Sequence, residues 1–262
     1  MHFYDWLGGC HSTTDPRYRH IAEDRTIAYF LEQGYLPSVT TILSVLRHAY
    51  LEKHKIKLAL DHYKLTQNYQ ESVEYRDQSA TAKGTRLHKL CETLFQTFVS
   101  DRTFYIPDGA TADEIQILSP LLQWAKAEVL EVEFTERTFV YFAAEYAGTA
   151  DLLVRTRSLG LLLIDFKFKA QTTAFPFQPS TEHAAQLSAY RNFFRSSYPN
   201  EQIAIANLLI DNLTKGAGRI ASLKIFPYKK DYTHFFAACH FLWKELNQPI
   251  PTSSRSNTLF FA

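Results

Sequence analysis

The sequence contains little cysteine: three residues, Cys10, Cys91 and Cys239, in a chain of 262. They lie far apart and form no Cys-x-x-Cys pair, which argues against a zinc site and against an iron–sulfur cluster held by four thiolates. A Walker A motif, GxxxxGK[ST], is also missing, so we expect no nucleotide cofactor, and an associated motor would be another chain. The few scattered thiols are typical of a reducing compartment.

Long apolar segments and a surplus of charge are missing as well. No run reaches the roughly 18 apolar residues of a transmembrane helix, and the N-terminal MHFYDWLGGCHSTTD resembles neither a signal peptide nor a transit peptide. We therefore expect a soluble, intracellular protein of the cytoplasm, without a membrane partner. Lys and Arg number 28 against 27 for Asp and Glu, so any affinity for nucleic acid must come from local basic patches.

The chain does have enough apolar residues for a sizeable core, since 46% of its residues are hydrophobic. Hydrophobic periodicity and turn residues predict one α/β domain over residues 1–262, in which residues 1–80 form a mostly helical N-terminal extension. The predicted elements are a hairpin within 17–36, a helical region from Ser38 to about residue 64, helices at 81–99 and 113–130 with Pro120 as a point of interruption, strands between 131 and 168, a helix at 181–195, strands at 203–211 and 219–228, and a helix at 231–246.

The residues with the clearest catalytic or metal-binding potential lie on two neighbouring apolar strands. Counting outward from the turn between Ser158 and Leu159 places Asp151 opposite Asp165 or Phe166, and Lys167 shares a sheet face with Asp165. Two acids and an amine at the ends of apolar strands require a divalent cation or a tight ion pair. A plain salt bridge between the lysine and the aspartates is the structural alternative, which a lone Asp-x-Lys would favour.

Three helices carry further polar candidates. His88 lies beside an apolar helical stripe, Gln186 and Tyr190 lie one turn apart on a later helix, and Ser38 precedes a helix start. For each of them there is a structural alternative. The histidine, glutamine and tyrosine could pack in the core, and the serine could cap its helix without touching a phosphate.

Five segments in a fixed order carry a family resemblance: LPSVTTIL at 36–43, GTRLHKLCE at 84–92, YAGTADLL at 146–153, LLIDFKF at 162–168 and AAQLSAY at 184–190. In order and spacing they resemble the RecB-like branch of the PD-(D/E)xK nuclease superfamily, in particular exonucleases of the mitochondrial genome maintenance type and their phage-encoded relatives. The resemblance covers about 150 residues. It departs from many relatives at Phe168, where they carry a threonine after the lysine.

The resemblance implies a restriction-endonuclease-like PD-(D/E)xK core, a central mixed sheet flanked by helices. It also implies that His88 is the motif histidine, that Asp151 and Asp165 are metal-binding acids, and that Lys167 is the catalytic lysine. Gln186 would take part in catalysis. Mg²⁺ or Mn²⁺ suits these ligands, and the backbone carbonyl of Phe166 could add another oxygen.

The implied activity is that of a hydrolase, a metal-dependent deoxyribonuclease that acts as an exonuclease on single-stranded or end-containing DNA. Its partners would be the DNA substrate and other proteins of replication, recombination or repair, and a phage-encoded origin would fit. DNA contacts are expected from Gln186, Tyr190, Ser38, Lys53, Lys55 and Lys57, with Lys215, Arg219, Lys229 and Lys230 as further rim candidates. Two alternatives stay open: a structure-specific endonuclease on the same core, and a nucleic-acid-binding protein without turnover.

Overall fold

The computed structural model describes residues 1–18, 21, 26–46, 64–67, 78–169, 180–211 and 222–247. The chain, for which the sequence predicts one domain, divides into two compact units. The aromatic unit, as we call it for its core, comprises Met1–Val45, Phe139–Gly148 and His234–Ala262. The sheet unit comprises Leu46–Thr138 and Thr149–Thr233.

The aromatic unit contains a small antiparallel sheet and short helices. Its strands are β1 (His2–Tyr4), β2 (Cys10–Ser12) and β3 (Leu36–Pro37), in the order β2-β1-β3. Its helical segments are η1 (Pro16–Tyr18), α1 (Thr26–Glu32), α2 (Val39–Leu43), η2 (Ser44–Leu46, which ends in the sheet unit), η3 (Phe142–Ala144) and most of α8 (Thr233–Asn247). The described part of residues 1–80 therefore includes three strands beside its helices.

Aromatic rings form the core of this unit. Phe3 and Phe30 are fully buried, and their rings stack with centroids 4.8 Å apart. The ring of Tyr18 meets Phe30 edge-on at 4.9 Å, and Tyr35 lies 5.5 Å from it. Such ring pairs add specific contacts to the burial of large apolar surfaces, so they hold short elements that have few backbone hydrogen bonds of their own.

Two local predictions for this region need revision. The hairpin predicted within 17–36 is wrong for the described residues, because α1 supplies the buried Phe30 and β3 pairs with β1. Aromatic residues fit a helix or a strand equally well until the core around them is known. The helix predicted from Ser38 starts as expected, with the Ser38 hydroxyl accepting from the amide of Thr41 at 3.0 Å. It gives way to η2 after Leu43, and residues 47–63 lie outside the described residues.

The sheet unit is built on a five-stranded mixed sheet, which confirms the predicted α/β class. The strands are β4 (Val129–Tyr141), β5 (Tyr146–Thr156), β6 (Gly160–Lys169), β7 (Ala204–Asp211) and β8 (Leu223–Pro227), in the order β4-β5-β6-β7-β8. β5 and β6 form an antiparallel hairpin, β6 and β7 run parallel, and β8 returns antiparallel to β7. The last residues of β4 and the first residues of β5, within Phe139–Gly148, belong to the aromatic unit.

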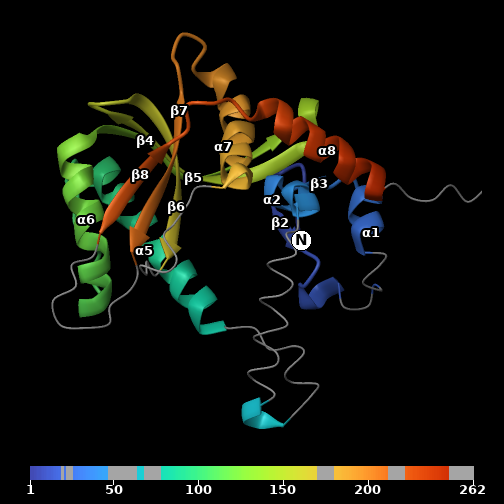
Figure 1. Ribbon diagram of the computed structural model, residues 1–262, viewed down its shortest axis with the longest axis horizontal. Helices are drawn as coiled ribbons and strands as arrows, with labels where there is room; N and C mark the ends of the chain where they lie inside the picture. The colour runs from blue at the N-terminus through green and yellow to red at the C-terminus, as the bar shows by residue number, and fades with distance from the viewer. Residues whose placement is uncertain are drawn as a thin grey trace, which may run out of the picture. The chain divides into compact units, whose positions relative to one another are not determined.

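Helices cover both faces of this sheet (Figure 1). Helices α5 (Gln78–Asp101) and α6 (Ala112–Glu128) lie on one face, and α7 (Thr181–Phe194), which ends in η4 (Arg195–Ser197), lies on the other. Helix α6 continues through Pro120, since the apolar face of this helix packs against the sheet. Among the described residues, no helix is both long and apolar enough to cross a membrane.

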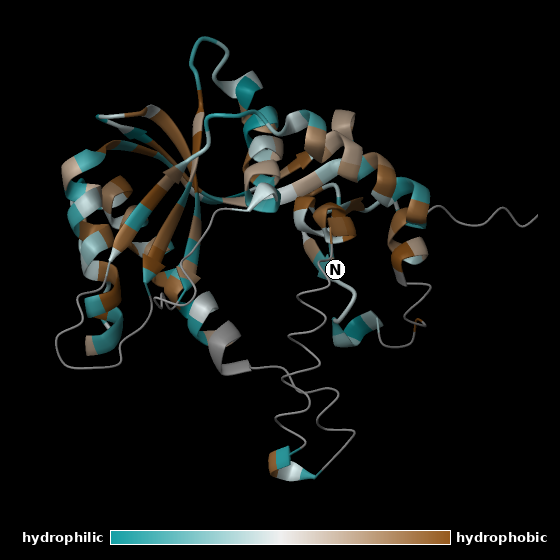
Figure 2. Cartoon of the chain, viewed as in Figure 1, coloured by the Kyte–Doolittle hydropathy of each residue, from teal (hydrophilic) through white to brown (hydrophobic). Residues whose placement is uncertain are grey.

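Alternation along β6 sorts its side chains between the two faces. Leu162, Ile164 and Phe166 join the core under α5 and α6, whereas Asp165 and Lys167 fall on the opposite face. The inner strands of the sheet are mainly hydrophobic in Figure 2, while the helices around them change from hydrophobic to hydrophilic from turn to turn. Polar side chains on β6 are therefore exceptions that need partners.

Candidate metal centre of the sheet unit

The β5–β6 hairpin brings two carboxylates together. Its ladder runs from Thr156 opposite Gly160 to Leu152 opposite Ile164, and Asp151 and Asp165 are the next residues along the two strands. There the Oδ2 atom of Asp151 accepts a hydrogen bond of 2.8 Å from the amide of Phe166. The N–H and C=O groups of one strand residue point toward the same neighbouring strand. The carbonyl of Phe166 is therefore expected to face β5, which carries Asp151. This is compatible with the predicted oxygen ligand.

Helix α5 contributes His88 to this strand end. Its Nδ1 atom lies 3.6 Å from Oδ2 of Asp151, and its ring meets the ring of Phe168 edge-on at 5.1 Å. Burial lowers the pKa of His88, against the opposing influence of Asp165. The imidazole therefore faces a carboxylate as a neutral nitrogen donor, the form that binds metals.

Asp165 and Lys167 form a close ion pair on the same strand. The Nζ atom of Lys167 lies 2.7 Å from Oδ2 and 3.0 Å from Oδ1 of Asp165, whose carboxylate is almost fully buried. Burial alone would lower the pKa of Lys167, but the charge and hydrogen bond of Asp165, with help from Asp151, raise it. The lysine is thus held beside the acids as an ammonium group.

Glu136, on β4, completes the cluster and was not among the residues predicted from the sequence. One ligand atom each from His88, Glu136 and Asp151 lies within 4.8 Å of the other two. Glu136 has a left-handed backbone conformation, with φ of 45°. A sequence signal for it existed, since period-2 alternation places Glu136 on the same strand face as the buried Val132 and Phe134.

Negative charge exceeds positive charge at this strand end. Burial, followed by the charge of Asp165, raises the pKa of Asp151 well above its usual range. Burial and the neighbouring Glu92 raise the pKa of Glu136 in the same direction. The carboxyl groups of Glu92, Glu136, Asp151 and Asp165 therefore outnumber the nearby ammonium groups of Lys89 and Lys167, and the local electrostatics favour a further cation.

Helix α7 faces the same region of the sheet. Its first turn, capped by the Ser180 hydroxyl at 3.1 Å from the amide of His183, carries a histidine that the sequence motifs do not include. Burial, followed by the charge of Lys167, lowers the pKa of His183 to about 4. One turn on, Nε2 of Gln186 donates to the hydroxyl of Tyr190 at 3.0 Å. Tyr190 is 4% exposed, which favours packing and does not favour base stacking.

The remaining predicted DNA contacts lie elsewhere in the chain. Ser38 belongs to the aromatic unit, where it is buried and its hydroxyl caps α2, in agreement with the capping alternative. Lys53, Lys55 and Lys57 lie outside the described residues, and their contact with DNA stays a prediction. Lys215 and Arg219 also lie outside the described residues, whereas Lys229 and Lys230, which follow Tyr228 after β8, are exposed on the sheet unit.

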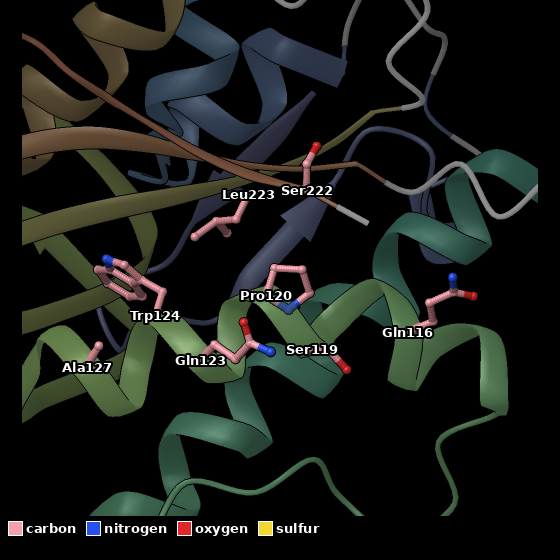
Figure 3. A pocket seen from close by; sticks show the side chains of 8 residues that line it. All are labelled: Gln116, Ser119, Pro120, Gln123, Trp124, Ala127, Ser222 and Leu223. Carbon is pink, nitrogen blue, oxygen red and sulfur yellow. The ribbon is translucent and has the colours of Figure 1, made fainter. Parts of the chain in front are cut away.

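A pocket of about 520 Å³ between α6 and β8 is lined by uncharged side chains, drawn in Figure 3. The amides of Gln116 and Gln123 and the indole of Trp124 give it polarity, but it holds neither a titratable group nor a metal ligand. This pocket therefore offers no group for metal binding, and the side chains of α5 and the β5–β6 hairpin form the better candidate site.

Comparison with known proteins adds no relative to this geometry: no family model and no curated protein matches the chain.

Proposed function

We propose that this protein is a metal-dependent deoxyribonuclease that hydrolyses phosphodiester bonds as an exonuclease on single-stranded or end-containing DNA. The observation that supports it most is the convergence of His88, Asp151, Asp165 and Lys167 at one place along the β5–β6 hairpin. These residues come from α5, β5 and β6, and they are the four to which the family resemblance assigns metal binding and catalysis. A salt bridge alone would account for Asp165 and Lys167, but not for the nearby imidazole and two further carboxyl groups.

The donor set fits a divalent cation such as Mg²⁺ or Mn²⁺. His88, Glu136 and Asp151 offer one nitrogen and carboxylate oxygens close together, which suits Mn²⁺ and, through the oxygens, Mg²⁺. Asp165 and the carbonyl of Phe166 are the further predicted ligands. When bound, the cation supplies Lewis acidity toward a phosphate oxygen and lowers the pKa of a water.

The chain's own residues then have distinct tasks. The ammonium group of Lys167, fixed by Asp165, can orient a water molecule and offset the charge that develops on the phosphate. The half-buried amide of Gln186 can hold the water or a phosphate oxygen, with the hydroxyl of Tyr190 fixing its orientation. Together these groups position an attacking water against a phosphodiester without a covalent intermediate.

The test uses end-labelled linear and closed circular single-stranded DNA, incubated with Mg²⁺, Mn²⁺ or a chelator. Degradation of the linear strand alone, abolished by the chelator and by Asp165→Ala, is the expected result. Asp108→Ala, which removes an exposed acid of the same unit, is the matched control and should cut normally. Cutting of circles would support the endonuclease alternative, and binding without cutting would overturn the proposed turnover.

A further inference from the structure

The buried carboxylate of Asp165 is held by a side-chain network that the sequence motifs do not reveal. Asn207 on β7 is fully buried, and its Nδ2 atom donates to Oδ2 of Asp165 at 2.6 Å. The hydroxyl of Tyr228, just after β8, donates in turn to Oδ1 of Asn207. The network therefore crosses three neighbouring strands.

Strand register explains why these three side chains meet. Asp165 and Asn207 are direct partners in the parallel β6–β7 pair, and Asn207 is opposite Phe226 in the antiparallel β7–β8 pair. Tyr228 lies two residues beyond Phe226, hence on the same face, and its amide extends the ladder by donating to the carbonyl of Ile205 at 2.9 Å. The position of the phenol is thus fixed by the sheet.

The tyrosine also fixes the orientation of the amide. A phenol has one hydrogen to donate, and an amide accepts through its oxygen and donates through its nitrogen. With Oδ1 of Asn207 engaged by Tyr228, Nδ2 must point toward Asp165. An amide in the opposite orientation would set its oxygen against the carboxylate, and an unsatisfied buried polar group is costly.

The two oxygens of Asp165 consequently differ. Oδ2 accepts the hydrogen bond of Asn207 at 2.6 Å and lies 2.7 Å from the Nζ atom of Lys167, whereas Oδ1 accepts the hydrogen bond of Lys167 at 3.0 Å. A carboxylate oxygen can accept about two hydrogen bonds. Oδ2 therefore has two close polar neighbours, and Oδ1, which has one, keeps capacity for another partner.

We propose that Tyr228 and Asn207 form a positioning relay that fixes the rotation of the Asp165 carboxylate and presents Oδ1 to the divalent cation. The inference rests on the proposed function, because it assigns these residues to the same metal site. Neither residue touches the substrate. Their effect is to spare Asp165 the reorganisation that metal binding would otherwise require, as outer partners do for metal ligands in general.

The test measures Mn²⁺ affinity by titration calorimetry, independently of cleavage, for the full-length wild-type chain, Tyr228→Phe, Asn207→Leu and the double variant. Tyr228→Phe should weaken Mn²⁺ binding about 10-fold and Asn207→Leu up to about 100-fold. The double variant should match Asn207→Leu alone, since the tyrosine acts through the amide. If Asn207→Leu does not fold, Asn207→Ser replaces it in both places.

Tyr198→Phe is the matched control, because it removes another phenol that donates to a carboxylate, Glu133, at 3.2 Å. It should retain wild-type Mn²⁺ affinity, and a thermal melt without metal checks that each variant is folded. Wild-type affinity in folded Tyr228→Phe, or additive losses in the double variant, would overturn the relay and leave the metal site intact. Failure of the wild-type chain itself to bind Mn²⁺ would overturn the metal site and the relay together.

Discussion

The aromatic unit and the sheet unit both contain clusters of polar side chains, but the contacts within these clusters differ. In the aromatic unit, Asp5 accepts from the amides of Leu7 and Gly9 at 2.9 and 2.7 Å and holds the turn between β1 and β2. Its other oxygen lies 3.1 Å from His11, whose Nδ1 lies 2.8 Å from the Tyr18 hydroxyl. These polar groups stabilise the unit's own backbone and core.

In the sheet unit, the polar groups of the strand end mainly face one another. Asp165 bonds to Lys167 and Asn207, and acids outnumber cations there. In the aromatic unit, two ion pairs join one acid to one base each, Arg17 to Asp15 and Lys244 to Glu145. A cluster of polar side chains alone therefore does not mark a site. A cluster that combines an imidazole with carboxyl groups of raised pKa is the better indicator.

The largest expected effect concerns packing in the aromatic unit. Phe30→Ala should lower the free energy of unfolding by about 3–5 kcal/mol, because it empties the centre of the ring cluster. Urea denaturation followed by near-ultraviolet circular dichroism measures the loss. Phe142→Ala, at a residue that is 58% exposed in the same unit, should change stability by no more than about 0.5 kcal/mol. Reduced Mn²⁺ affinity in folded Phe30→Ala would contradict the assignment of the aromatic core to stability alone, without a role in metal binding.

The next effect concerns chemistry in the sheet unit. Asp165→Ala and Lys167→Ala should each reduce cleavage at least about 100-fold, while the folded state and much of the DNA binding remain. Initial rates on end-labelled DNA and circular dichroism spectra measure the two properties separately. Lys126→Ala, at an exposed position of α6, is the control for the lysine. Residual activity above about one part in a hundred would count against the proposed roles.

His88→Ala should have a smaller and more specific effect. Its nitrogen is the softer donor of the cluster, so its loss should weaken Mn²⁺ binding about 10-fold and change the preference between Mn²⁺ and Mg²⁺. Metal titrations of cleavage measure the shift. An unchanged titration together with a lower melting temperature would instead assign His88 to the core, against the rings of Phe166 and Phe168.

The sequence could predict the features that depend on local periodicity. A short turn and a period of two predict Asp151 opposite Asp165 or Phe166, and the observed ladder, which ends with Leu152 opposite Ile164, agrees with that count. The helical repeat of Leu87, Cys91 and Leu94 predicts α5, which carries His88 to the strand end. These inferences succeeded because each needs neighbours along the chain or across one hairpin.

Features that depend on distant partners could not be predicted in this way. Asn207 and Tyr228 reach Asp165 through a parallel pairing across a helix and an antiparallel pairing of β8, and neither register is readable from turn length. The segment 26–32 could have been strand or helix, and only the ring cluster around Phe30 makes the helix favourable. Packing between distant segments decided both cases.

The smallest expected effect concerns surface charge, which differs between the two units. Lys229 and Lys230 are exposed on the sheet unit, whereas Lys244 of the aromatic unit pairs with Glu145. Each phosphate contact releases counterions, so Lys229→Gln together with Lys230→Gln should flatten the salt dependence of single-stranded DNA binding by about 1.4 units in log–log slope. Lys244→Gln is the control and should leave the slope unchanged. Fluorescence anisotropy at several salt concentrations measures the DNA affinity of the wild type and of both variants. Equal slopes for the double variant and the wild type would show that Lys229 and Lys230 do not contact phosphates.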